Sequence, residues 1–110
     1  MNEKNLLIEA IEQDSFYTKA QRRLLKSLVD LEENYIIKCT VFELSQLSSM
    51  SRASVYRCIE FLNKENVIEI KNTTSNTLSL FSLNSVKLEE IKKNYLKKLA
   101  LRKNEKIMQK

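Results

Sequence analysis

The sequence contains no glycine, no proline and no histidine. Without glycine there is no glycine-rich loop to cradle a phosphate, which excludes the P-loop and dinucleotide-binding motifs. Without proline, no helix carries a proline kink. Backbone positions that need a left-handed conformation must use the next-best residue, usually asparagine, and ten asparagines are present.

The sequence has few residues in patterns that are typical of catalysis or metal binding. Histidine, the commonest general base, is absent. The carboxylate pairs Glu32–Glu33 and Glu89–Glu90 stand at an expected helix end and an expected helix start, where solvation or the helix dipole accounts for them. Cys39 and Cys58 have no Cys or His neighbours at zinc-ligand spacing, and we expect both to be small buried side chains in a reducing compartment. The sequence therefore predicts no enzyme, metal or cofactor, and it gives no sign of a small-molecule ligand.

Long hydrophobic runs are missing as well. No apolar stretch approaches the ~18–20 residues that span a bilayer. The first apolar run, Leu6–Ile8, is soon followed by Glu9 and Glu12, so a signal peptide is not expected. We expect a cytoplasmic protein without membrane contact.

What is present is an ordinary globular composition. The 110 residues are 43% hydrophobic and 30% charged, which allows one domain with a modest core. The net charge is +5, but residues 87–110 carry +6 and residues 1–86 carry −1. The basic charge therefore belongs to the C-terminal segment, and net charge alone gives no argument that the central part binds an anionic partner.

Hydrophobic periodicity predicts helix, helix, strand, helix, turn, helix, strand, strand and helix, in that order. Thr18–Gln21 and Thr40–Glu43 each fit a capping box. The second helix is expected to end near Asn34, and the last to start at residue 84 or 85 with Glu89 and Glu90 in its first turn. We expect a mainly α fold with a small antiparallel sheet (α+β), divided into a domain of residues 1–84 and a basic C-terminal helix of residues 85–110.

Residues 42–62 have the pattern of a helix-turn-helix, in which the second helix projects into the DNA major groove. Ser48–Met50 is the expected turn, and Ser51 is expected to cap the second helix. Ser49 occupies a turn position that usually holds glycine, at a strain cost of ~1 kcal/mol. The apolar residues expected to clamp the two helices together are Leu44, Leu47, Val55, Ile59 and Leu62.

The stretch Glu43–Ile70 resembles the DNA-binding domain of catabolite-activator-type regulators. The matching residues are Ser51, Arg52, Val55, Arg57, Leu62, Asn66 and Ile68. The resemblance implies a winged helix-turn-helix over about residues 18–84, in which Arg52 and Arg57 reach bases or phosphates. The flanking helices give a layout also similar to the smaller multiple-antibiotic-resistance-type regulators. The nucleotide-sensing domain of catabolite activators has no counterpart here, so cyclic-nucleotide binding is not implied.

Periodicity also leaves one face of the second helix free. With Val55, Ile59 and Leu62 inward, the opposite face carries Ala53, Arg57, Glu60 and Lys64, with Tyr56 alongside. The predicted DNA contacts on this helix are Ser51, Arg52, Ala53, Ser54, Tyr56, Arg57 and Lys64. Lys71 and Asn72, at the start of the wing loop, are predicted to contact flanking DNA. A second basic cluster, in which phosphate positioning is the alternative to a merely solvated face, comprises Lys19, Arg22, Arg23 and Lys26.

These features favour sequence-specific binding of double-stranded DNA by a transcriptional regulator. A plasmid or phage replication or maintenance factor with the same fold is one alternative. A winged helix used only for protein–protein contact is the other, and the −1 charge of residues 1–86 keeps it open. We expect a homodimer, because two-fold symmetry suits paired half-sites. The C-terminal helix carries an apolar stripe, Leu88, Ile91, Tyr95 and Leu99, that needs a covering surface. That surface is either its own winged domain or the same helix, with the N-terminal helix, of a second subunit, and we favour the second subunit.

Overall fold

The computed structural model describes residues 3–72 and 78–108, apart from the side chains of Asn72 and of residues 103–108. These residues form α1 (Glu3–Glu12), α2 (Lys19–Leu31), β1 (Ile36–Cys39), α3 (Val41–Ser48), α4 (Arg52–Lys64), β2 (Ile68–Asn72), β3 (Ser79–Leu83) and α5 (Ser85–Met108). The predicted order of elements is confirmed, and the class is α+β.

The three strands form one antiparallel sheet in the order β1-β3-β2. Phe81, in the central strand, is aligned with Ile37 on one side and Ile70 on the other, and its side chain is completely buried. The structure turns Ser79, Phe81 and Leu83 of β3 inward. The sheet thus presents one apolar face to the helices.

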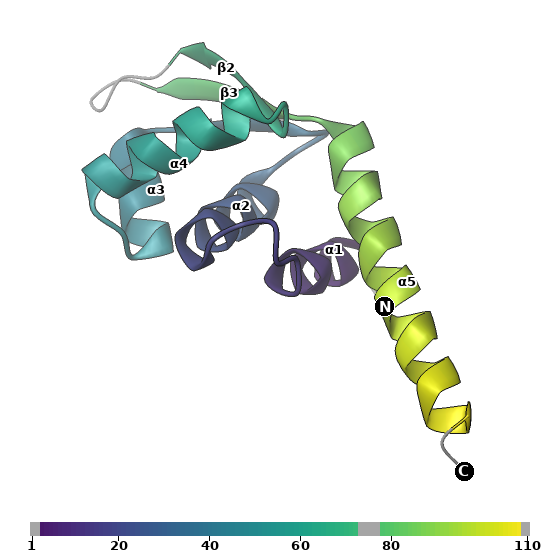
Figure 1. Ribbon diagram of the computed structural model, residues 1–110. Helices are drawn as coiled ribbons and strands as arrows, with labels where there is room; N and C mark the ends of the chain where they lie inside the picture. Colours follow the sequence, from purple (N-terminus) through teal and green to yellow (C-terminus); the bar gives the residue numbers. More distant parts are fainter. Residues whose placement is uncertain (1–2, 73–77, 109–110) are drawn as a thin grey trace.

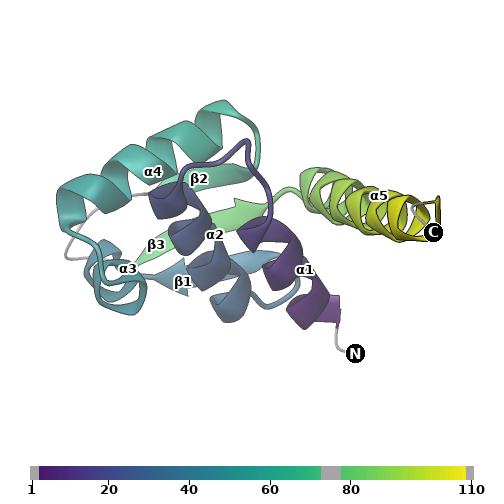
Figure 2. The ribbon, with the colours of Figure 1, turned by 60° about the horizontal axis from the view of Figure 1, so that its bottom comes forward.

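Helices α1 to α4 gather on that face of the sheet, and α5 leads away from them (Figure 1; Figure 2). The core lies between, with contributions from every helix and strand. In α2, the spacing of Leu24, Leu25, Leu28 and Val29 places all four on one stripe, and all four are buried. The whole molecule measures 58 × 26 × 24 Å, because α5 continues past the body.

Left-handed backbone occurs where a glycine would ordinarily stand, at Asn34, Tyr35, Ser49 and Asn66. Asn66 closes α4, and the amide of Val67 donates to the carbonyl of Leu62 at 2.9 Å. The prediction that α2 runs to Asn34 is wrong, because α2 ends at Leu31. Asn34 and Tyr35 instead form the tight connection into β1, closed by a bridge between Glu33 and Ile36.

Two predictions about the placement of residues in helices are wrong. Leu47, expected to clamp the helix pair, is 58% exposed, because α3 turns Val41, Leu44 and Ser48 inward instead. Glu89 and Glu90 are not in the first turn of α5, because the helix begins at Ser85 and its first turn ends before them. Asn84 precedes that turn, and its side-chain oxygen accepts from the amides of Val86 and Lys87.

The start of α5 belongs to the core of this same chain. Leu88 and Ile91 are buried, and Tyr95 donates a hydrogen bond to Glu9 of α1. The expectation that a second subunit covers the whole apolar stripe is therefore wrong for its first half. Leu96 and Leu101, further along α5, are 47% and 61% exposed.

None of the helices in the described part of the chain is both long and apolar enough to cross a membrane.

Candidate nucleic-acid interface

The helix pair α3–α4 is held in place by local hydrogen bonds that the sequence dictates. Thr40 caps α3: its hydroxyl accepts from the amide of Glu43 at 3.0 Å, and the Glu43 carboxylate accepts from the amide of Thr40 at 3.1 Å. Both arms of the predicted capping box are present. They fix where α3 begins relative to β1.

The turn between the helices depends on Ser49. Its backbone is left-handed, with φ 57° and ψ 42°. Its amide donates to the Gln46 carbonyl, and the Met50 amide donates to the Ser45 carbonyl. The Ser45 hydroxyl also donates to the Met50 carbonyl at 2.6 Å. The turn is therefore closed without glycine, as a hydrogen-bonded helix end that sets the crossing of α3 and α4.

Ser51 caps α4 as predicted, and its hydroxyl oxygen accepts from the amide of Ser54 at 3.1 Å. The Ser51 hydroxyl lies 3.0 Å from that of Ser54 and donates to it. The two hydroxyl groups therefore organise the helix start. Ser54 is half-buried, whereas Ser51 and Ala53 are exposed.

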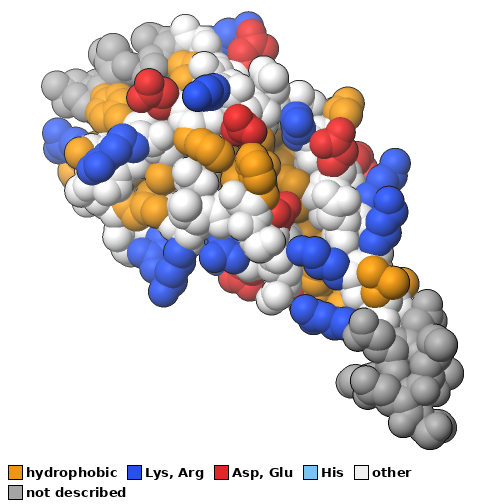
Figure 3. Space-filling view, in the orientation of Figure 1, with side chains coloured by type: hydrophobic (Ala, Val, Ile, Leu, Met, Phe, Trp, Pro, Cys, Tyr) orange, Lys and Arg blue, Asp and Glu red, His pale blue; other side chains and the backbone are white. Residues whose placement is uncertain are grey.

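The outer face of α4 is open. Tyr56, Arg57, Glu60 and Lys64 are exposed, while Val55, Cys58, Ile59 and Leu62 are buried, as the periodicity predicts. In Figure 3, blue side chains gather at the end of the molecule where α4 begins in Figure 1. Lys64 lies in the last turn, about 18 Å along the helix from Arg52 at 1.5 Å per residue. The structure therefore brings the predicted residues of the first two turns together and places Lys64 apart from them.

Arg52 has a contact that the sequence did not predict. Its guanidinium carbon lies 5.3 Å from the centre of the Phe42 ring, a cation–π arrangement. Phe42 is 43% exposed on the first turn of α3. An apolar residue on the outward side of a short helix is the only sequence signal for this contact. Phe42 thereby orients the first arginine of α4.

Arg57 is less restrained. Its Nε donates to the carbonyl of Ala53 in the preceding turn, at 3.4 Å, which is long for such a bond. In the part of the chain that the structure describes, no carboxylate forms an ion pair with Arg52 or Arg57. Neither guanidinium is therefore held by an ion pair, although Glu60 shares the open face of α4 with Arg57.

The structure describes only some of the residues that are predicted to contact DNA from the wing. Lys71 is exposed on β2 and pairs with Glu69 at 2.8 Å. This ion pair offsets the positive charge of Lys71 locally. The Asn72 side chain and residues 73–76 of the wing loop lie outside the described residues, so their predicted contacts stay predictions.

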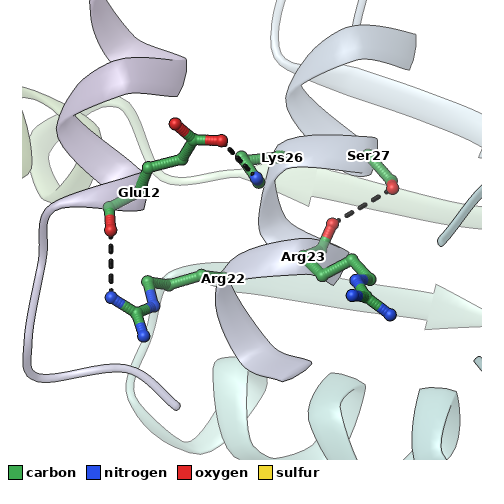
Figure 4. Close-up of polar contacts among 5 residues, drawn as sticks. All are labelled: Glu12, Arg22, Arg23, Lys26 and Ser27. Atoms are coloured by element: carbon green, nitrogen blue, oxygen red, sulfur yellow. Dashed lines mark hydrogen bonds and ion pairs between the residues drawn. The ribbon is translucent and has the colours of Figure 1, made fainter. Parts of the chain in front are cut away.

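The second basic cluster divides into two pairs. Arg22 donates to the Glu12 carbonyl at 2.9 Å, and Lys26 forms an ion pair with the Glu12 carboxylate at 2.6 Å. Figure 4 shows both directed at Glu12, while the Arg23 side chain points elsewhere. Arg22 and Lys26 therefore join α2 to α1, and Lys19 and Arg23 are exposed.

Both cysteines are buried, as predicted. Burial raises the pKa of the Cys39 thiol to about 11, with a smaller contribution from Glu43. Burial also raises the pKa of Cys58, against the opposing charge of Arg57. Burial therefore favours the protonated form of both thiols.

No protein-family model matches the chain, and no curated protein matches its sequence. Among solved structures, the fold is similar to that of a possible transcriptional regulator from Methanosarcina mazei Go1. That match has a TM-score of 0.52 and 13% identity, and it covers 99% of this chain and 88% of the other. The fold is also similar to the adhesin competence repressor (AdcR) from Streptococcus pyogenes. Here the TM-score is 0.52 and the identity 18%, over 96% of this chain and 75% of the other.

At these identities the likeness is one of fold. The chain has a winged helix-turn-helix fold, with its α+β composition as predicted. Neither match bears on the finer likeness of residues 43–70 to catabolite-activator-type domains, which stays a prediction.

Proposed function

We propose that this protein is a transcriptional regulator that reads double-stranded DNA with the first half of α4. The observation that carries the proposal is the pair of arginines, without an ion pair to any described residue, on the open face of a capped helix in this fold. Arg57, in the second turn, suits a bidentate contact to guanine in the major groove. Arg52, in the first turn, suits a phosphate or a base edge, with Phe42 holding it in place.

The other predicted contacts take supporting roles. Ser51, Ala53 and Ser54 bring the helix start close to the DNA backbone, and Tyr56 suits a phosphate or a thymine methyl group. Lys64 lies beyond the groove-facing turns and suits a phosphate. Lys71 and Asn72 suit the flanking backbone or minor groove. Contacts of this kind position the protein and carry little sequence information.

A homodimer is part of the proposal. Leu96, in the middle of α5, and Leu101, further along it, are exposed, which supports contact with the same helix of a second subunit. A two-fold dimer presents two copies of α4 to two half-sites of a symmetric DNA sequence. We propose that this assembly works in the cytoplasm.

The test begins with selection of bound duplexes from a random pool, which yields the preferred sequence and its symmetry. Fluorescence anisotropy then compares Arg57→Ala with the wild type on that duplex. We expect the substitution to weaken binding by ~1–3 kcal/mol and to relax preference at one base pair of each half-site. The matched control is Arg23→Ala, which removes the same charge from the exposed side of α2 and should leave base preference unchanged. Equal base preference in Arg57→Ala and the wild type would show that α4 does not read the bases.

A protein-binding winged helix is the second candidate, because residues 1–86 carry a net charge of −1. The anisotropy titration at two salt concentrations distinguishes the DNA-binding candidate from the protein-binding one. DNA binding that weakens steeply with salt indicates phosphate contacts. Absence of binding at the lower salt concentration would favour the protein-binding candidate. A replication or maintenance factor would also bind DNA, and its selected sequence would be found at replication origins.

A further inference from the structure

An open hollow of about 360 Å³ lies between the α1–α2 connection, the end of α4 and the second and third turns of α5. It lies beside the end of α4, next to Lys64 and away from the proposed DNA contacts in the first two turns. In Figure 3, orange side chains flanked by red ones cover the middle of the molecule, where Figure 1 places that connection between α4 and α5. The volume is within the range of small-molecule sites.

One wall of the hollow is aromatic. The Phe16 ring lies 5.0 Å from the Tyr17 ring, edge to face, and 6.0 Å from the Phe61 ring of α4. Two neighbouring rings therefore hold Phe16 in place, yet it remains 59% exposed. A fixed and exposed aromatic ring is a surface for an apolar group or for a cation.

Tyr17 supplies a hydrogen-bonding group without a partner. The residue is only 7% exposed, and its hydroxyl makes no hydrogen bond to any residue that the structure describes. No fully buried polar atom in that part of the chain lacks a partner, so the Tyr17 hydroxyl keeps some contact with solvent, and Tyr17 is one of the residues that line the hollow. Burial, followed by Asp14, Glu65 and Glu90, raises the pKa of Tyr17 to about 12. The hydroxyl is therefore neutral and free to accept a hydrogen bond.

The charge around the hollow is predominantly negative. Asp14, Glu65 and Glu90 line it, against one cation, Lys87, among its described residues. Lys87 pairs with Glu90 only at the long distance of 3.9 Å. Asp14 accepts from the Phe16 amide at 3.0 Å, which fixes its carboxylate, and Glu65 has no ion pair within the described residues. This field favours a cation and disfavours an anion.

We propose that the hollow binds a small organic cation, an amine or quaternary ammonium ion with an apolar substituent. The ammonium group lies among the carboxylates, where Tyr17 accepts a hydrogen bond if the ion has an N–H to donate. The apolar part packs on Phe16. Because Glu65 caps the end of α4, and Glu90 belongs to α5, the occupant contacts the end of the helix that bears the proposed DNA contacts. Its influence on DNA affinity rests on the proposed function, whereas its binding does not.

Calorimetric titration of the full chain, without DNA, tests the binding. The probes are benzyltrimethylammonium, the neutral benzyl alcohol and the anionic benzoate. We expect saturable binding of the cation about tenfold tighter than that of the alcohol, and no saturation with benzoate. Equal affinity for the three probes, or no binding of the cation, overturns the proposal.

Substitutions locate the site. Glu65→Gln should weaken cation binding about fivefold, and Phe16→Ala should weaken it by a similar factor, with far-UV circular dichroism unchanged because Phe16 is exposed. The matched control is Glu33→Gln, at an exposed carboxylate before β1, which should leave the affinity unchanged. Equal affinities of Glu65→Gln and Glu33→Gln would place the cation elsewhere and overturn the assignment.

Tyr17→Phe should affect cations that have an N–H group differently from quaternary ammonium ions. It should weaken benzylammonium about fivefold, because a hydrogen bond is lost, and leave benzyltrimethylammonium unchanged, since that ion has no N–H group. An equal effect on both ions would contradict the role of the hydroxyl. Anisotropy with the selected duplex, with and without saturating benzyltrimethylammonium, then tests coupling, which we expect to change DNA affinity at least about threefold. Unchanged DNA affinity, with calorimetric binding intact, overturns the coupling alone.

Discussion

Ser49 holds a backbone conformation that costs a side-chain-bearing residue free energy. Its φ of 57° lies in the left-handed region, which glycine reaches without steric cost. We predict that Ser49→Gly is neutral or raises the free energy of unfolding by up to ~1 kcal/mol, since relief of strain outweighs the added freedom of the unfolded chain. Urea denaturation measures it. A clear loss of stability would show that the Ser49 side chain contributes more than its backbone strain costs.

Buried ionisable groups make stability depend on alkaline pH. The pKa of Cys39 is raised to about 11 and that of Tyr17 to about 12, both mainly by burial. Because the folded pKa exceeds the unfolded one, the neutral forms contribute stability that is complete below about pH 8.5 and is lost as the pH rises towards the folded values. Urea midpoints measured from about pH 8 to pH 11 should fall. Tyr17→Phe should flatten the upper part of this decline, and an unchanged slope would exclude Tyr17 as a source.

At the scale of the helix, Thr40 sets the start of α3. Removing its hydroxyl in Thr40→Ala leaves the amide of Glu43 without its acceptor. We expect the free energy of unfolding to fall by ~1 kcal/mol, with the base preference of bound DNA unchanged. Thr40→Ser, which keeps the acceptor, is the matched control. Thermal melts measure both, and equal melting temperatures for the alanine and serine variants would assign the cap no energetic role.

Elements governed by neighbouring residues could be predicted from the sequence. Thr40, Ser51 and Asn66 mark helix ends because capping depends only on residues a few positions away. The open face of α4 was also predictable, since its buried residues follow the helical period. These local rules were enough to predict the helix ends and the open face that form most of the candidate interface.

Features governed by packing between distant residues could not be predicted. Leu47 and Ser48 compete for the inner face of α3, and only the tertiary arrangement places Ser48 inside. The contact of Arg52 with Phe42 depends on the crossing of two helices. The apolar stripe of α5 has the same pattern whether α1 or a second subunit covers it.

At the scale of the whole molecule, the proposed dimer depends on exposed residues of α5. Deleting residues 87–110 would also remove Leu88 and Ile91 from the core, so substitution of exposed residues is the sharper test. We predict that the double variant Leu96→Gln and Leu101→Gln remains folded but sediments as a monomer, and that it binds a two-fold symmetric duplex more weakly. Sedimentation velocity measures the mass.

The control for this prediction is Val86→Gln, at a residue 65% exposed in the first turn of α5. It adds the same polar group to the same helix outside the proposed contact, so its mass should equal that of the wild type. A wild type that sediments as a monomer, or a double variant that still forms a dimer, would remove α5 from the assembly.

The strand at the centre of the sheet is the last of the three along the chain. Because β3 lies between β1 and β2, the residues of β1 have no strand partner until residues 79–83 are available. During synthesis, β1 and β2 therefore remain unpaired until β3 has left the ribosome and completes the sheet. Pairing of this range slows folding relative to local helix formation. The sheet is thus completed last, whereas the mutual contacts of α2, α3 and α4 need only residues 19–64.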